Sequence, residues 1–98
     1  SRGLGDVYKR QGIGKIADRV ETIGDSPGFL WEEASNHLKK SFKSSTLVVA
    51  KGMGNFEALT ELRDLGVHVF FLFKAKCSPV ARSVGVKVGS LVALLKIL

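Results

Sequence analysis

The sequence lacks several features that would assign it to a particular class of protein. It holds one cysteine among 98 residues, which excludes an intramolecular disulfide framework and favours a reducing compartment. No apolar run approaches the roughly 20 residues that span a bilayer, and the N-terminus lacks the charged-then-apolar layout of a signal peptide. Internal repeats and low-complexity tracts are also missing. We therefore expect a soluble, cytoplasmic protein without a membrane partner, comprising one domain or part of one.

The net charge of +6 is not distributed as in a nucleic-acid-binding protein. Arg2, Lys9 and Arg10 lie in the first 11 positions, and without that segment the chain has 12 basic and 8 acidic residues. The remaining basic residues are spread out, apart from a group in residues 39–43, and they do not alternate with aromatic residues as a stacking surface requires. We therefore expect no nucleic-acid partner. A steep salt dependence of DNA affinity would contradict this.

Residues 1–11 show neither helical nor strand periodicity. They resemble a translated sequencing-linker segment of the kind found at the ends of peptides predicted from environmental DNA. We therefore divide the chain into a non-native segment, residues 1–11, and an α/β fragment, residues 12–98. This division predicts that the gene continues upstream of Gly12.

The periodicity of the remaining chain predicts alternating helices and strands. Residues 12–23 fit a short helix followed by a strand, although the pattern leaves both readings open, and residues 24–28 form a Pro-Gly turn. Residues 30–42 carry apolar side chains at helical spacing, which predicts a helix with one buried face. Strands are expected at residues 46–50, 67–73 and 91–97, and helices at residues 56–65, where Gly66 would stop the helix, and 79–83. The order βαβαβ predicts an α/β fold with a parallel sheet.

Two polar loops follow the first two of these strands. Lys51 and Asn55 lie in the first loop and Lys74 and Lys76 in the second, and parallel strands bring their carboxyl ends to one edge of a sheet. The ammonium groups, with backbone N–H groups freed by Gly52 and Gly54, would suit a phosphoryl oxyanion. In that reading Met53 lies in the substrate-binding loop, Asn55 donates to the anion, and Glu57 acts as a base or orients another group.

A structural reading of the same residues is equally open. A glycine-containing turn between a strand and a helix is common, Asn55 is a good N-cap, and lysines after a strand often only extend into solvent. The Gly-Met-Gly pattern is neither a P-loop nor a dinucleotide-binding fingerprint. Cys77 has no neighbouring histidine in sequence, and His37 and His68 lack metal-ligand spacing, so we predict no metal ligands in this chain.

Four stretches together resemble the C-terminal part of the damage-control phosphatase family, also called acidic-residue methyltransferase-like proteins. They are Gly24-Asp-Ser-Pro-Gly28, Ala50-Lys-Gly-Met-Gly-Asn-Phe-Glu57, Phe71-Leu-Phe-Lys-Ala-Lys-Cys77 and Val80-Ala-Arg-Ser-Val-Gly-Val86. The resemblance runs from about Gly12 to the end of the chain, and its motifs are similar to those of the smaller prokaryotic branch.

The resemblance implies a fold, an activity and a set of site residues. The fold is a Rossmann-like three-layer αβα domain with a mainly parallel sheet. The activity is metal-dependent hydrolysis of phosphorylated metabolites such as sugar phosphates, with Mg, Mn, Co or Ni activating the attacking water. In the family the metal is held by an Asp-Asn pair and a further Asp that precede this chain, and Asp25 does not match them. Matching positions imply a substrate-side loop with catalytic and binding roles at Lys51, Gly52, Asn55 and Glu57, a phosphate-contacting Lys74, and a structural Cys77.

If the metal ligands lie upstream, the 98-residue chain would bind no metal and would be inactive alone. The alternative is a non-catalytic phosphate- or nucleotide-binding α/β module. Such a module would bind anions without metal and would show no turnover even in the full-length protein. The sequence gives no indication of the oligomeric state.

Overall fold

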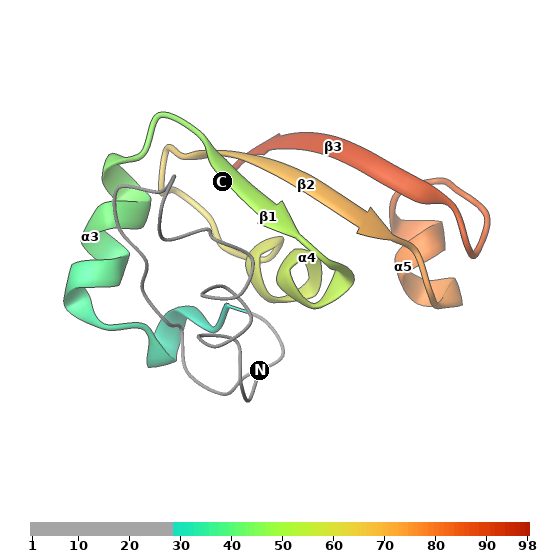
Figure 1. Ribbon diagram of the computed structural model, residues 1–98, viewed down its shortest axis with the longest axis horizontal. Coiled ribbons are helices and arrows are strands. Elements are labelled where there is room, and N and C mark those ends of the chain that lie inside the picture. The colour runs from blue at the N-terminus through green and yellow to red at the C-terminus, as the bar shows by residue number, and fades with distance from the viewer. Residues whose placement is uncertain (1–28) are drawn as a thin grey trace, which may run out of the picture.

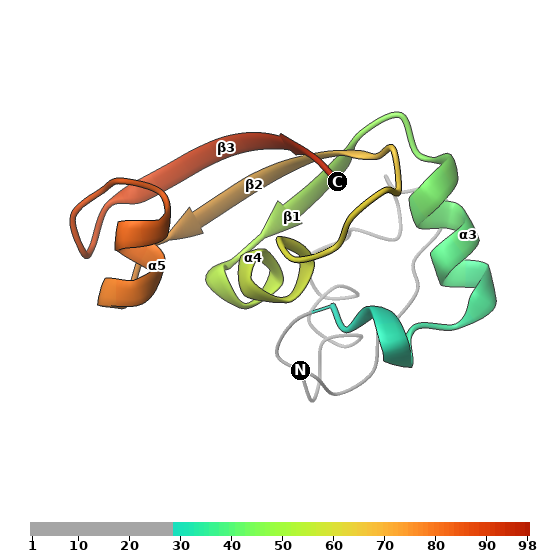
Figure 2. The same cartoon turned by 180° about the vertical axis from the view of Figure 1, so that it is seen from behind.

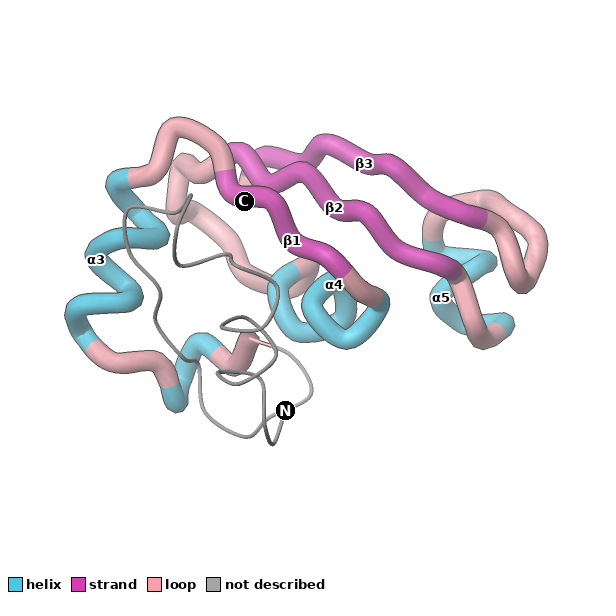
Figure 3. Tube along the Cα trace, viewed as in Figure 1, coloured by secondary structure: helices cyan, strands magenta, loops and turns pink. Residues whose placement is uncertain are grey.

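The structure, a computed structural model, describes residues 29–98, in which helices pack against a three-stranded sheet (Figures 1 and 3). The predictions made for residues 1–28, including the Pro-Gly turn, lie outside this range. In chain order the elements are the 3-10 helix η1 (Trp31–Glu33), α3 (Asn36–Ser44), β1 (Val48–Lys51), α4 (Met53–Leu59), β2 (His68–Lys74), α5 (Ser78–Ser83) and β3 (Leu91–Ile97). This mixture of helices and strands confirms the predicted α/β class.

The sheet has the order β1-β2-β3 and contains one parallel and one antiparallel pair. β1 and β2 are parallel, as predicted, with Ala50 opposite Phe71. β3 was expected to continue the parallel sheet, and this was wrong: β3 is antiparallel to β2, with Lys74 opposite Leu91. The connection after β2 closes at the end of that strand, where the Ala75 N–H donates to the Ser90 carbonyl oxygen at 2.9 Å and the Gly89 N–H donates to the Ala75 carbonyl oxygen at 2.7 Å. The chain therefore turns back at the end where β2 finishes.

The helix predicted for residues 30–42 is divided into two elements. Trp31–Glu33 forms a 3-10 turn, Ala34 is extended, and the α-helix begins only at Asn36. Ser35 is the N-cap, and its hydroxyl oxygen accepts a hydrogen bond from the Leu38 N–H at 3.1 Å. Serine favours this position because its side chain satisfies a donor that the first helical turn leaves free. The helix ends at Ser44, and Ser45 is its C-cap.

Helix α4 begins and ends earlier than its apolar pattern indicated. It was predicted over residues 56–65 but spans Met53–Leu59, so Met53 and Asn55 lie on its first turn instead of in a loop. The Arg63 guanidinium donates to the carbonyl oxygens of Thr60 and Leu62, both at 2.8 Å, and satisfies groups at the helix end. Gly66 does not stop the helix; it lies in the following loop with φ of +68°.

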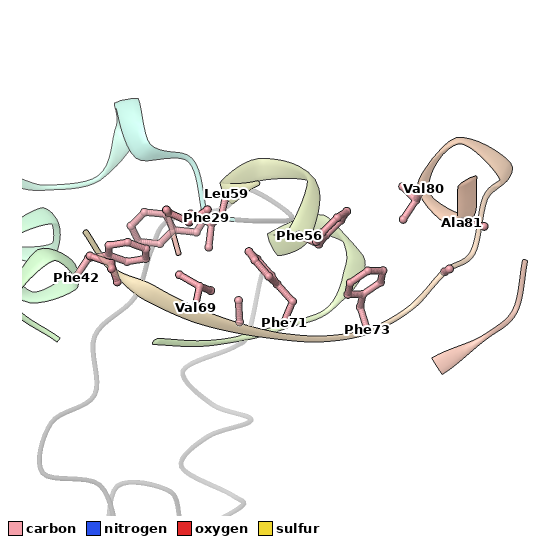
Figure 4. Close-up of a cluster of buried hydrophobic side chains, with 13 residues drawn as sticks. Phe29, Phe42, Phe56, Leu59, Val69, Phe71, Phe73, Val80 and Ala81 are labelled. Carbon is pink, nitrogen blue, oxygen red and sulfur yellow. The ribbon is translucent and has the colours of Figure 1, made fainter. Parts of the chain in front are cut away.

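The core lies between the sheet and α4 (Figure 4). Val69, Phe71 and Phe73 alternate along β2 and are buried on the face that α4 covers. Phe56 of α4 packs edge-on against Phe71 at 5.2 Å and stacks on Phe73 at 4.5 Å between ring centroids. A second aromatic group, formed by residues 29, 31 and 42, extends this core toward α3.

The opposite side of the sheet, here called the outer face, is apolar and exposed. Figures 1 and 2 show α4 and α5 on one side of the sheet, and no helix within residues 29–98 covers the other. Large apolar side chains on the outer face are therefore open to solvent, among them Val49, Leu72, Leu95 and Ile97. β2 is apolar along nearly its whole length, a pattern typical of strands that are buried on both faces. Within the described range only one face is packed.

None of the helices in this range is long and apolar enough to cross a membrane.

Candidate functional site

A pocket of about 420 Å³ lies at the edge of the sheet where β1 and β2 end and β3 begins. Three lysines contribute to its wall, and none of the residues that line it carries a carboxylate. Apolar side chains from β2, β3 and α4 form most of the rest. The lining residues are Lys51, Gly52, Met53, Leu72, Phe73, Lys74, Lys76, Leu91 and Val92. This edge of the sheet is therefore basic with an apolar base, which suits an anion that carries a non-polar part.

The strand pairing brings the lysines together. Lys51 is the last residue of β1 and lies opposite Leu72, and Lys74 is the last residue of β2, two positions further on. Because alternate residues of a strand share a face, Lys51 and Lys74 lie on the same side of the sheet as Leu72. Lys76 follows in the next loop, and its N–H makes a 3.4 Å contact with the Met53 sulfur. The predicted convergence of the two lysine loops is therefore present in the structure.

Four apolar lining residues were not predicted from the sequence: Leu72, Phe73, Leu91 and Val92. Leu91 and Val92 begin β3 and lie opposite Lys74 and Phe73. In a parallel sheet the start of β3 would lie at the other edge, so the expected topology placed these residues away from the site. The length of the connection gives no signal for this, because residues 75–90, which join β2 to β3, are as many as residues 52–67, which join the parallel strands β1 and β2.

Gly52 forms the junction between β1 and α4. It is the N-cap of α4 and has φ of +97° and ψ of +149°, a conformation that residues with a Cβ rarely adopt. The expectation that its N–H would be free for an anion was wrong, because this N–H donates to the Leu72 carbonyl oxygen at 2.8 Å and extends the β1–β2 pairing. The glycine therefore permits the turn, and the lysine side chains supply the charge of the pocket.

Replacing Gly52 with alanine should destabilise the chain by about 1–3 kcal/mol, the usual cost of this backbone conformation for a non-glycine residue. A Cβ at Gly52 would meet no atom within 4 Å, so backbone strain alone accounts for the loss. Urea denaturation measures it. Gly66→Ala is the matched control, since Gly66 also has positive φ but precedes β2, at the opposite end of that strand from Lys74. Both variants should lose stability, but only Gly52→Ala should weaken the binding of inorganic phosphate. An equal effect of both on binding would contradict this assignment.

The other predicted site residues do not line the pocket. Asn55 lies on the first turn of α4, and both ends of its amide are hydrogen-bonded: Oδ1 accepts from the Phe29 N–H at 2.7 Å, and Nδ2 donates to the Lys51 carbonyl oxygen at 2.8 Å. It is not the N-cap of α4, a position that Gly52 occupies. Gly54 precedes Asn55 in the helix, and Glu57, two positions after Asn55, is exposed. A catalytic role of Asn55 or Glu57 stays a prediction.

The residues with metal-binding or nucleophilic side chains are dispersed. Cys77 is a half-buried free thiol that packs at the margin of the core, just before α5. His68 is exposed at the start of β2, at the end of that strand opposite Lys74. Across residues 29–98 there is no group of three or more His, Cys, Asp or Glu side chains that could hold a metal ion. These residues do not form a binding site for a divalent cation.

Comparison with known proteins gives one matching family model. Residues 6–92 match the model described as the damage-control phosphatase ARMT1-like domain. Among curated proteins, the chain is 45% identical over 83 residues to an uncharacterised protein of Methanocaldococcus jannaschii, an alignment that covers 84% of this chain and 27% of that protein.

Two similar archaeal proteins carry functional names. A damage-control phosphatase of Archaeoglobus fulgidus is 40% identical over 84 residues, covering 83% of this chain and 28% of the relative. One from Pyrococcus horikoshii is 37% identical over 86 residues, covering 88% of this chain and 29% of the relative. The chain therefore spans less than a third of the length of these relatives.

A solved structure has the same fold. The crystal structure of a DUF89 family protein from Pyrococcus horikoshii superposes with a TM-score of 0.78 at 36% sequence identity. The superposition covers 91% of this chain and 30% of that structure. The mixed sheet and the edge that carries the lysines thus belong to a fold observed in a longer protein.

Proposed function

This chain belongs to the damage-control phosphatase ARMT1-like family, and we propose that the longer protein containing it, here called the parent protein, hydrolyses phosphate esters. Its substrates would be small phosphorylated metabolites, with sugar phosphates as the first candidates. Family membership supports the reaction class, and two relatives are named as damage-control phosphatases. The single cysteine of the sequence is compatible with action in the cytoplasm.

The observation that carries this proposal is the pocket formed around Lys51, Lys74 and Lys76. A phosphoryl group gains negative charge on its oxygens as a phosphate ester is cleaved, and ammonium groups placed beforehand stabilise that charge. The volume of about 420 Å³ lies within the range of small-molecule sites. These residues would supply the electrostatic half of an active site, binding the phosphoryl group and leaving the rest of the substrate against the apolar base.

We also propose that activity requires a divalent cation whose ligands lie outside residues 29–98, since those residues do not fit one. A bound cation of this kind supplies a Lewis acid and a nucleophilic water in many phosphatases. The 98-residue chain alone would then bind phosphate through its lysines but would not hydrolyse a phosphate ester.

The test is to recover the gene upstream of Gly12 and assay the parent protein against a panel of sugar phosphates with Mg, Mn, Co or Ni. We expect phosphate release that depends on the cation and is abolished by a chelator, and no release from the 98-residue chain under the same conditions. Turnover by the short chain would contradict its proposed inactivity. Saturable phosphate binding by a folded parent protein that turns over no substrate with any metal would support the non-catalytic binding module instead.

A further inference from the structure

We propose that Asn55 is a positioning residue that holds Lys51 in place for the phosphoryl group, and that it does not itself contact the substrate. This inference rests on the proposed function of the lysine pocket. It starts from the two hydrogen bonds of the Asn55 amide, which join segments far apart in the sequence: Oδ1 accepts from Phe29, 26 positions earlier, and Nδ2 donates to the carbonyl oxygen of Lys51.

The bond to Lys51 acts on the turn that presents this lysine. Lys51 ends β1, and the next residue, Gly52, already has the positive φ that starts α4. The carbonyl group of Lys51 therefore lies between a strand and a helix, and the Asn55 amide holds it from the first turn of that helix. Fixing this peptide group limits the directions in which the Lys51 side chain can leave the backbone. Asn55 thus controls a pocket lysine without lining the pocket.

The bond to Phe29 fixes the other end of the amide. Phe29 is buried and stacks on Phe42 of α3 with ring centroids 5.5 Å apart, so its backbone is held by the aromatic group beside α3. When Oδ1 accepts from this backbone N–H, the amide plane is set, and Nδ2 points to Lys51. The two bonds require a side chain that both donates and accepts a hydrogen bond. Asparagine meets this requirement, and aspartate and leucine do not.

Three substitutions separate the two bonds. Asn55→Ala removes both. Asn55→Asp keeps an acceptor for Phe29 but cannot donate to Lys51. Asn55→Ser is too short to reach Phe29, and it should lose the bond to Lys51 as well, because Lys51 belongs to β1 and its carbonyl group lies outside the helix.

Amide hydrogen exchange tests the bridge directly, independently of any ligand. In the parent protein, exchange at Phe29 should be about tenfold faster in Asn55→Ala and Asn55→Ser than in the wild type, because one hydrogen bond is lost. It should be unchanged in Asn55→Asp. Faster exchange in all three variants, or in none of them, would overturn the bridge.

Titration of the parent protein with inorganic phosphate tests the positioning role. We expect Asn55→Ala and Asn55→Ser each to raise the dissociation constant for phosphate about tenfold. The decisive comparison is made in a Lys51→Ala background. If Asn55 acts through Lys51, Asn55→Ala has no further effect there, whereas a residue that touches phosphate directly gives additive losses.

The outcomes distinguish this inference from the function on which it rests. Additive losses, or unchanged affinity in a folded Asn55→Ala protein, would overturn the positioning role and leave the lysine pocket standing. A wild-type parent protein that binds no phosphate would overturn the proposed function, and the role of Asn55 in it would fall as well.

Discussion

Replacing Lys74 with alanine in the parent protein should lower kcat/KM for its phosphate ester by about 10²–10³-fold, the usual effect of removing one preorganised charge-stabilising donor. Lys51→Ala should have an effect of the same order. Both ammonium groups line the pocket on one side of the sheet edge, and none of the lining residues carries a carboxylate that would neutralise their charge. Steady-state kinetics at saturating metal concentration measures both variants.

Lys87→Ala is the matched control for loss of charge. Lys87 is exposed and lies outside the pocket lining, so its removal changes the net charge equally without touching the site. It should leave kcat/KM within about a factor of two, since surface substitutions of this kind have small effects. Equal effects of Lys74→Ala and Lys87→Ala would mean that only the overall charge of the protein matters, and the pocket would then not be the phosphate site.

Much of this pocket could be predicted from the sequence because its lysines follow strands. Apolar β-branched and aromatic runs located β1, β2 and β3, and the parallel pairing of the first two brings Lys51 and Lys74 to the same edge. Polar residues directly after buried strands can thus be identified from the sequence alone. The contribution of β3 was not predicted, because the residues of the strand do not determine its direction, and the connection before it is as long as that of the parallel pair β1 and β2.

The role of Asn55 could not be predicted from the residues next to it in the sequence. Its position between Gly54 and Phe56 suited a helix cap or an anion donor equally well. Its acceptor is engaged by the backbone of Phe29, which lies before η1, and a partner separated by 26 positions leaves no local pattern. The first turn of α4 was assigned to a loop for a similar reason, since two glycines outweighed the helical spacing that begins at Met53.

The 98-residue chain should lose about 3–5 kcal/mol of unfolding free energy when Phe71 is replaced with alanine, as expected for truncation of a fully buried aromatic residue. Phe71 has no exposed surface, lies on the central strand and packs edge-on against Phe56. Phe70, its neighbour on the same strand, points to the outer face and is only half-buried. Phe70→Ala should therefore cost about 1 kcal/mol, the typical effect of a single substitution. Urea denaturation of the two variants compares the faces of one strand directly.

The same pair of variants in the parent protein tests the three-layer fold implied by the family resemblance. If a second layer of helices covers the outer face there, Phe70 becomes a core residue, and its replacement should cost nearly as much as that of Phe71. The cost at Phe71 should stay the same in both proteins, because α4 already covers that face. A cost at Phe70 that remains near 1 kcal/mol in the parent protein would show that the outer face is not packed against a further layer. The exposed apolar side chains of β1 and β3 would then need a different explanation, such as association between copies.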